Sequence, residues 1–278
     1  MTEMEVRPMA AEATTAQPLE TGWLPSTPAG DTLLHDYVVH DAERIVALAE
    51  LHGGRVLRRP DVVAADLGRP AGLANCAMLL QPPVGDLGVV ADLEDWYAGQ
   101  GHGTVLLWSP WPTPDLHARG WVLEGHPPLL VRPPDGPLPP AVPLTRVHRV
   151  SSDDELELAC RVLVDGFPLR ELQPYRPGAL FAARLWRDPR WQVWFATLDG
   201  QPVSAAVLFV ARGMAQLHLA ATLPHARGRG AWQALVRARL QAAHGLLSAG
   251  VFSDHSRPGI ARLGYLPITR FTLWHRTR

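Results

Sequence analysis

The sequence predicts an α/β protein made of two similar domains in tandem. Short apolar runs typical of strands alternate along the chain with amphipathic stretches typical of helices. A proline-rich stretch at 132–144 suits neither a helix nor a central strand, and it divides the chain nearly in half. A weak internal repeat places similar blocks near the ends of both halves. These observations together predict two α/β units joined by a proline-rich linker.

The first half begins with a polar, small-residue segment at 1–20, for which we expect a disordered tail. Hydrophobic periodicity then assigns the elements, with apolar positions three and four apart for helices and short apolar runs for strands. In order, these are a helix at 33–51, strands at 55–65 and 75–80, a helix at 87–98, a strand at 104–108, a short helix at 115–118 and a strand at 128–132.

The second half follows the same rules. Ser151 or Ser152 is expected to cap a helix that starts at Asp154. The dipeptide Asp199-Gly200 between two apolar runs predicts a hairpin. The expected elements are a strand at 144–150, the capped helix, a helical region at 177–186, strands at 191–198 and 203–210, a strand around Leu217, a helix after 227–230, a strand at 247–252, a short helix at 258–263 and a strand at 267–275.

The repeat pairs the block that begins at Ser109 with the block that begins at Ser253. Five positions agree without gaps when each block is placed between two apolar strands. They are Ser109 with Ser253, Pro114 with Pro258, Leu116 with Ile260, Gly120 with Gly264, and Trp121 with Tyr265. The repeated order of elements favours a tandem arrangement.

Composition limits the partners of this chain. Its 278 residues carry a formal net charge of −1, and 47% are hydrophobic, which suffices for a packed core. The charge gives no general attraction to nucleic acid or to anionic membranes. No apolar run reaches the roughly 18 residues that span a bilayer, and the N-terminus has no signal-like apolar region. We therefore expect a cytoplasmic protein that binds neither nucleic acid nor membrane, as a monomer or a homodimer.

Missing residue types exclude several chemistries. All 26 basic residues are arginine, so a P-loop lysine, a Schiff base and any lysine nucleophile are excluded. Neither G-x-S-x-G nor H-E-x-x-H occurs, which argues against the common α/β-hydrolases and zinc proteases. Cys76 and Cys160 lie far apart without ligand spacing, so we expect buried free thiols and no metal site.

The segment 217–240 carries the strongest functional signal. An apolar strand is followed by the turn Arg227-Gly228-Arg229-Gly230 and then by an amphipathic helix. The first turn of a helix leaves backbone N–H groups unpaired, which favours an anion. Glycines let the backbone approach a ligand closely, and arginines offer forked donors that match phosphate oxygens. The pattern predicts a pyrophosphate site.

Here the sequence resembles the GNAT superfamily of acetyl-CoA-dependent N-acetyltransferases, whose motif R/Q-x-x-G-x-G/A opens a helix after a strand. Arg227 and Gly230 match it, whereas Trp232 takes its last small position. The block LGY at Leu263 resembles the LGF that closes many GNAT domains. The resemblance implies two tandem GNAT-like domains, each a mixed, mostly antiparallel sheet flanked by helices. Its expected parts are a tail at 1–20, a degenerate domain at 21–135, a linker at 136–143 and an acetyltransferase domain at 144–278.

By this resemblance, acetyl-CoA is the cosubstrate, and its acetyl group lies beside the strand before the helix. Because Trp232 lies on the apolar face of that helix, we expect it to pack in the core as well. The implied cofactor-binding residues are Leu219, Ala220, Ala221, Thr222, Arg227, Gly228, Arg229, Gly230, Ala231 and Trp232.

Catalysis needs a base for the attacking amine and a proton for the leaving thiolate. His218 is the candidate base, because similar arylalkylamine N-acetyltransferases place a histidine on this strand. The tyrosine that family members commonly use as the acid is replaced by Ile260. His255 and Ser256 are the candidate substitutes in the nearby loop, whereas Tyr265 is expected to be a core residue.

The corresponding helix of the first half has acidic residues at or near its start. They are Asp86, Asp92 and Glu94. Carboxylates there would repel a pyrophosphate, so the first half is predicted to lack a cofactor site.

The sequence thus predicts an N-acetyltransferase whose acceptor is a small-molecule or peptide amine in a cleft near the interdomain face. The loss of the tyrosine keeps a second function open, an acyl-CoA-binding sensor or catalytically inactive GNAT-like protein. A nucleic-acid-binding protein that uses the arginines is a third alternative, which the near-neutral charge disfavours.

Overall fold

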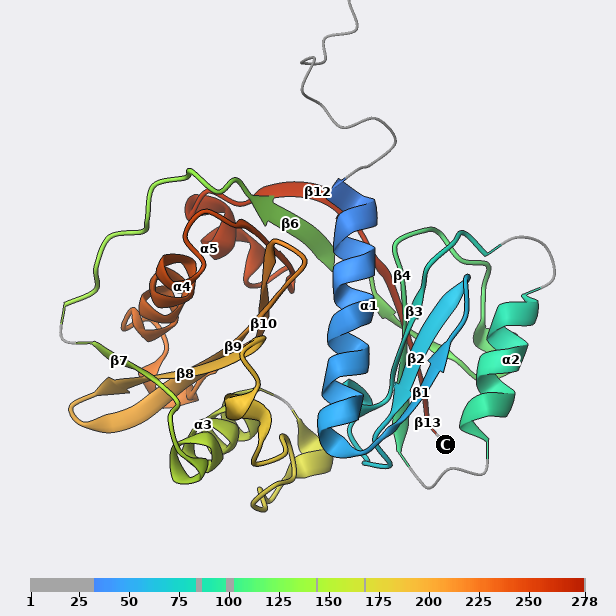
Figure 1. The fold of residues 1–278 in the computed structure, drawn as a ribbon, viewed down its shortest axis with the longest axis horizontal. Coiled ribbons are helices and arrows are strands. Elements are labelled where there is room, and N and C mark those ends of the chain that lie inside the picture. The colour runs from blue at the N-terminus through green and yellow to red at the C-terminus, as the bar shows by residue number, and fades with distance from the viewer. Residues whose placement is uncertain (1–32, 84–86, 99–102, 144, 168, 278) are drawn as a thin grey trace, which may run out of the picture. The chain divides into compact units, whose positions relative to one another are not determined.

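The structure is a computed structural model that describes residues 33–83, 87–98, 103–143, 145–167 and 169–277. The predicted tail at 1–20 and Asp86 lie outside the described residues. Residues Leu33–Arg278 form one compact unit with two sheets flanked by helices (Figure 1). Each sheet contains one parallel strand pair, and its other pairs are antiparallel. This confirms the predicted fold class.

The first sheet has the strand order β1-β2-β3-β4-β13-β5. Its parallel pair, β3 and β4, is connected by the helix α2. Its strands are β1 (Arg55–Arg58), β2 (Val62–Asp66), β3 (Cys76–Leu79), β4 (Thr104–Ser109), β5 (Val122–Gly125) and β13 (Thr272–Thr277). The helices of this half are α1 (Leu33–His52) and α2 (Gly88–Tyr97), with short 3-10 turns η1 (Gly72–Ala74) and η2 (His117–Arg119).

The second sheet has the order β12-β6-β11-β10-β9-β8-β7. Its parallel pair, β10 and β11, is connected by α4 in the same way. The strands are β6 (Pro128–Arg132), β7 (Arg146–Arg149), β8 (Trp191–Leu198), β9 (Gln201–Ala211), β10 (Met214–Thr222), β11 (Leu247–Val251) and β12 (Leu266–Arg270). The helices are α3 (Asp153–Gly166), α4 (Ala231–Ala242) and α5 (Arg257–Arg262), with 3-10 turns η3 (Arg170–Leu172), η4 (Leu185–Arg187) and η5 (Pro224–Ala226).

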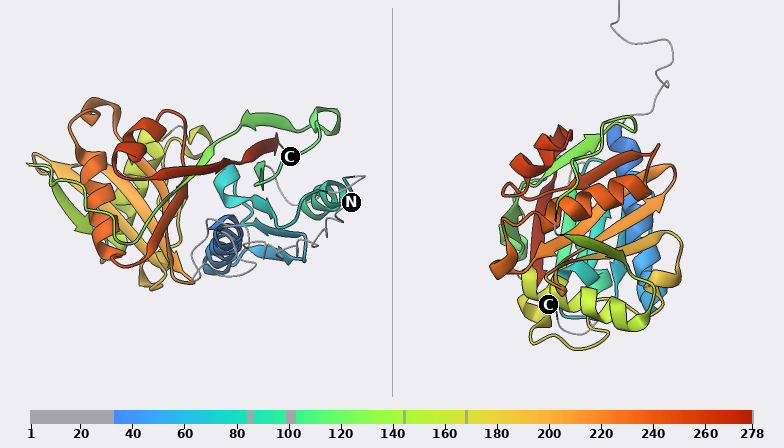
Figure 2. Two further views of the ribbon diagram at one scale, coloured as in Figure 1. Left: turned by 90° about the horizontal axis from the view of Figure 1, so that it is seen from above. Right: turned by 90° about the vertical axis from the view of Figure 1, so that its left-hand side faces the viewer.

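The two halves exchange their last strands. β6 lies between β11 and β12 of the second sheet, and β13 lies between β4 and β5 of the first (Figure 2). The border between the sheets therefore does not coincide with the linker at 136–143. The predicted domains at 21–135 and 144–278 therefore do not match the two sheets. The first range lacks β13 of the first sheet, and the second range lacks β6 of the second sheet.

The repeat residues occupy matching environments. Leu116 and Ile260 are both fully buried, and Trp121 and Tyr265 are nearly so. Gly120 and Gly264, which precede the two aromatic residues, both have a positive φ, 79° and 87°. The repeat therefore marks equivalent turns in the two halves.

Local signals explain several element ends. The side chain of Ser152 caps α3 by accepting a hydrogen bond from the Glu155 N–H at 3.2 Å. Asp199 and Gly200 have φ values of 52° and 76° and join β8 to β9, which confirms the predicted hairpin.

Several expectations about elements were wrong or incomplete. The strand expected at 55–65 is two antiparallel strands, β1 and β2. The stretch 177–186 is not an α-helix, and only the short turn η4 begins within it. β5 was not predicted, because its alternation is broken by charged and glycine residues. The single strand expected at 267–275 is two strands in different sheets, and Phe271 marks the crossing between them.

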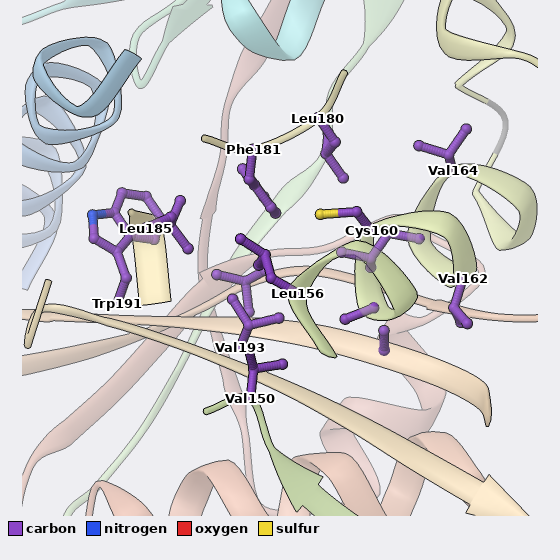
Figure 3. Close-up of a cluster of buried hydrophobic side chains, with 14 of the residues drawn as sticks. Val150, Leu156, Cys160, Val162, Val164, Leu180, Phe181, Leu185, Trp191 and Val193 are labelled. Carbon is purple, nitrogen blue, oxygen red and sulfur yellow. The ribbon is translucent and has the colours of Figure 1, made fainter. Parts of the chain in front are cut away.

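The cores hold these layers together. On one side of the second sheet, α3 packs Leu156 and Cys160 toward Val193 and Trp191 of β8 (Figure 3). A second cluster includes α1 residues such as Tyr37 and residues of both sheets, so α1 packs against both of them. Cys76 and Cys160 are buried free thiols, as predicted.

Candidate functional site

A bulge in β10 positions the candidate site. His218 pairs with Val207 of β9 and Ala220 pairs with Ala206, so Leu219 is an extra residue. Its φ of 28° shows the local distortion. An extra residue interrupts the ladder and turns backbone groups away from the neighbouring strand. The bulge thus lies where the sequence predicts the acetyl group.

The neighbouring strand separates from β10 just before this bulge. The parallel pairing of β10 with β11 begins at Met214 and Leu247, and its last pair is Gln216 with Ala249. Both strands continue past that pair, β10 to Thr222 and β11 to Val251. The divergence leaves space beside the bulge.

A cavity of about 350 Å³ occupies this space. Residues from both sheets and from α1 surround it. Its polar lining residues are Tyr37, Asp41, Arg44, Gln216, His218, Arg239, Ser253 and Ser256, and its apolar ones include Met78, Trp108, Leu219, Trp232, Phe252 and Leu273. Such a cavity, with a mostly apolar surface and polar groups placed along its wall, is typical of a small-molecule site.

His218 lies at the wall of the cavity, partly buried, with its ring 6.4 Å from the Trp191 ring in an edge arrangement. Burial, with a smaller contribution from Arg44, lowers the pKa of His218 to about 3, although Asp41 opposes this shift. The imidazole is therefore uncharged at neutral pH, and its low pKa makes it a weaker base than an exposed histidine.

A hydrogen-bonded group of α1 and β10 side chains borders the same cavity. Asp41 accepts from Arg44 Nε and from Gln216 Nε2, both at 2.6 Å, and the same amide nitrogen donates to the Tyr37 hydroxyl at 2.9 Å. Burial acts to raise the pKa of Asp41, but Arg44 and Gln216 outweigh it and keep the carboxyl ionised. The charges of Asp41 and Arg44 therefore compensate each other.

The predicted phosphate turn lies at the start of α4. Gly230 is the N-cap with a φ of 84°, and Gly228 has a φ of 76°. A Cβ on Gly230 would lie 2.6 Å from Val142 of the linker, whereas the space around Gly228 is open. Glycine is thus required at 230 for two reasons, conformation and close approach.

A second pocket of about 530 Å³ opens at this turn. Thr222, Gly228 and Gly230 line it, as does Arg262 of α5. Arg227 also lines it, but its Nε donates to Thr222 O at 3.2 Å and its Nη2 to Gly166 O at 3.1 Å. Arg227 therefore also fixes the turn to β10 and α3.

Four of the six remaining predicted cofactor residues line one or both pockets. Leu219 and Ala220 line the cavity at the bulge, Ala231 lines the pocket at the turn, and Trp232 lines both. The structure does not bring every one of them to a pocket wall, because Arg229 pairs with Asp199 at 3.1 Å and Ala221 is buried beside α3. Trp232 also packs in the core, as expected.

The candidate acids lie in the loop after β11. Ser256 lines the cavity together with Ser253, whereas His255 is exposed and lies outside the lining. Ile260 is fully buried, and the Tyr265 hydroxyl is paired with Ser248 Oγ at 2.5 Å inside the core.

The sequence analysis missed several lining residues. Asp41 and Arg44 precede Gln216 of β10 by more than 170 positions, and no local motif links them to that strand. Arg239 was also missed, because it was placed on neither the apolar nor the polar face of its helix. Its spacing from Leu235 and Leu240 could have indicated that it lies on the buried side.

Two of the acidic residues predicted at or near the start of α2, Asp92 and Glu94, lie beyond its first turn. The first turn of α2 has no acidic residue. Asp92 and Glu94 lie further along and pair with Arg59 and Arg119, so their charges are compensated. Repulsion by these two carboxylates therefore does not explain why the first half would lack a cofactor site.

Solved structures share this arrangement. No protein-family model matches the sequence, and no curated protein matches it significantly. A GCN5-related N-acetyltransferase from Kribbella flavida aligns over 88% of this chain and 95% of its own, with 18% identity and a TM-score of 0.64. The chain has the GNAT fold.

Two further structures support the GNAT fold over most of both chains. A GCN5-related N-acetyltransferase-like protein from Streptococcus suis covers 85% of this chain and 99% of its own, with 16% identity and a TM-score of 0.54. A putative GNAT-family acetyltransferase from Novosphingobium aromaticivorans covers 82% and 92%, with 20% identity and a TM-score of 0.52.

The described residues bear on two further features of the chain. They contain no helix long and apolar enough to cross a membrane. They also contain no group of three or more His, Cys, Asp or Glu side chains arranged to hold a metal ion.

Proposed function

We propose that this chain is an acetyl-CoA-dependent N-acetyltransferase that transfers the acetyl group to an amine in the cavity at the β10 bulge. One combined observation supports the proposal. On a GNAT fold, β10 has a bulge, β11 separates from β10 beside it, and α4 begins at a turn of glycines and arginines.

Acetyl-CoA would bind across the two pockets. The backbone N–H groups of residues 228–232 suit a pyrophosphate, and Arg227 and Arg262 add positive charge at the pocket wall. The separation of β10 from β11 gives the pantetheine a path toward the bulge. Trp232 lines both pockets and would therefore flank that path.

His218 would take the proton of the attacking amine. It is uncharged at neutral pH and lines the cavity, so it can act directly or through a water. Backbone N–H groups at Leu219 and Ala220 would polarise the thioester carbonyl. Ser256 lies where it could assist the leaving thiolate, and His255 could do so only after a change of the loop.

The acceptor would be a small-molecule or peptide amine, since the cavity is small and mostly apolar. We further propose a cytoplasmic monomer or homodimer that acts without nucleic acid or membrane. The first half would supply part of the acceptor cavity, through α1 and residues such as Met78 and Trp108.

A second function is favoured by one observation. Ile260, at the position of the family's usual tyrosine, is completely buried, and Tyr265 is held by Ser248. A chain without this acid could bind acyl-CoA as a sensor and not transfer its acyl group.

The release of free CoA thiol from acetyl-CoA, measured against a panel of small amines and peptides, separates the two functions. An amine-dependent release well above the rate with water alone supports the transferase. Tight binding of acetyl-CoA without release, for every amine, supports the sensor and contradicts the transferase.

A further inference from the structure

Arg239 of α4 is a buried cation at the cavity. Only 2% of its surface is exposed, and it faces the sheet from the inner side of the helix. Nε donates to Leu235 O at 3.2 Å and Nη1 to Val207 O at 3.1 Å. Within the described ranges, no carboxylate pairs with Arg239 and its Nη2 has no hydrogen-bond acceptor.

This guanidinium reaches the sheet at the bulge. Val207, which accepts its hydrogen bond, is the register partner of His218, the residue just before Leu219. Arg239, His218 and Leu219 line one cavity. Arg239 comes from α4, the helix that begins at the phosphate turn, so it approaches the bulge from the side of the proposed acyl donor.

The charges around the cavity leave Arg239 uncompensated. Asp41 and Arg44 form a pair, and His218 is uncharged at neutral pH. The phenol of Tyr265 lies near Arg239, but it is neutral in the physiological range because burial raises its pKa to about 12. Burying an unpaired cation costs free energy, so a cavity that contains one favours an anionic group.

We propose that Arg239 stabilises the thiolate of CoA as it leaves the acetyl group. This role rests on the proposed function. The amine nitrogen attacks the thioester carbon, its proton passes to His218, and the carbon–sulfur bond breaks with its electron pair going to sulfur. The thiolate then lies beside the guanidinium and is protonated from the solvent as His218 releases its proton.

The inference also explains how transfer can proceed without the usual tyrosine. A fixed positive charge on a buried side chain stabilises a developing anion more strongly than it would in water. Burial lowers the pKa of Arg239 to about 10, so the guanidinium stays charged at neutral pH.

Calorimetric binding of CoA and of S-methyl-CoA, between pH 6 and 9, tests this role without any acceptor. Only CoA can ionise at sulfur, and the thiol of cysteine, taken as the reference, has a pKa of about 8.5. We expect the affinity for CoA relative to S-methyl-CoA to rise about tenfold as pH increases, since a one-unit lower pKa of the bound thiol corresponds to that factor.

In Arg239→Gln this rise should disappear, while the affinity for S-methyl-CoA stays within about threefold. Arg239→Lys should retain part of the rise because it keeps the charge. Arg237→Gln is the matched control, since Arg237 is on the same helix and donates instead to Pro139 O. It should behave as the wild type.

Equal pH dependence of the two ligands in the wild type, or a rise that persists in Arg239→Gln, would overturn the role of Arg239 and leave the proposed function intact. Failure of both ligands to bind the wild type would refute the proposed function as well. If Arg239→Gln does not fold, the wild-type comparison and Arg239→Lys still decide.

Discussion

His218 shows how one residue can be placed by sequence while its chemistry depends on distant neighbours. Its position on the strand before the phosphate turn was evident from the sequence. Its uncharged state was not, because it follows from burial and from Arg44, which lies 174 positions earlier (218 − 44). The sequence therefore located the candidate base, and the fold determines its protonation state.

The first prediction concerns that base. His218→Ala should lower the acetyl-transfer rate by about a hundredfold or more, the usual loss for a general base, with CoA affinity nearly unchanged. His148→Ala is the control, because His148 stacks on Phe195 away from the cavity at the bulge. Initial rates and calorimetry test both variants. A full rate in His218→Ala would show that the histidine is structural.

The second prediction compares two glycines of the turn. Gly228 and Gly230 have similar positive φ values, but only at Gly230 would a Cβ meet Val142. Gly230→Ala should therefore lower the free energy of unfolding by about 1–3 kcal/mol more than Gly228→Ala. Urea denaturation measures the difference. The double variant Gly230→Ala, Val142→Ala should recover part of it, and equal losses in both single variants would contradict the close approach.

At the scale of elements, the sequence predicted best where one local signal decides. The hairpin at Asp199 and Gly200, the cap at Ser152 and the order of β10, turn and α4 all follow from residues close in the chain. Predictions failed where tertiary contacts decide. The region 177–186 has helical composition, yet it packs against α3 mostly as irregular chain, and its Arg184 donates to carbonyls at the end of α1.

The third prediction concerns the crossing between the sheets. Phe271 is fully buried between β12 and β13, and its ring meets Tyr37 of α1 edge-on at 5.8 Å. Phe271→Ala should cost about 3–5 kcal/mol, the range for removing a buried phenylalanine side chain. Phe271→Leu should cost less because it retains more volume. Urea denaturation checks both, and a loss below about 1 kcal/mol in the alanine variant would contradict this packing.

At the scale of the whole molecule, the exchanged strands couple the two halves. β13 completes the first sheet and β6 lies inside the second, so neither half contains its full sheet. A sequence pattern shows strands but not their partners, which is why the repeat suggested two separable domains. The cavity at the bulge also depends on both halves, because α1 of the first half and β10 and α4 of the second half all contribute to its lining.

The fourth prediction concerns acid. Burial lowers the pKa of His40 to about 4, well below the 6.5 of an exposed histidine. His40 therefore binds a proton in the unfolded chain at pH values where it stays uncharged in the folded chain. The free energy of unfolding falls as pH decreases from about 6.5 to 4. For the fully buried His40 this loss is on the order of 3 kcal/mol. His52 and His218 act in the same direction.

Unfolding by urea at pH 7 and at pH 5 measures this effect. His40→Gln should flatten the pH dependence, because glutamine does not titrate. Exposed His255, changed to Gln, is the control and should leave it unchanged. A slope that is identical in all three proteins would show that His40 is not a source of acid sensitivity.

The central claim is that acetyl-CoA binds once per chain, at the start of α4, and calorimetric titration of the full chain tests it most directly. The account predicts one site, weakened about tenfold or more by Gly228→Asp, which puts a carboxylate beside the amides expected to hold the pyrophosphate. Gly245→Asp is the matched control, since Gly245 has a similar φ of 81° and equally open surroundings but lies beyond the other end of α4. Two sites per chain, or an equal effect of the two substitutions, would contradict the account.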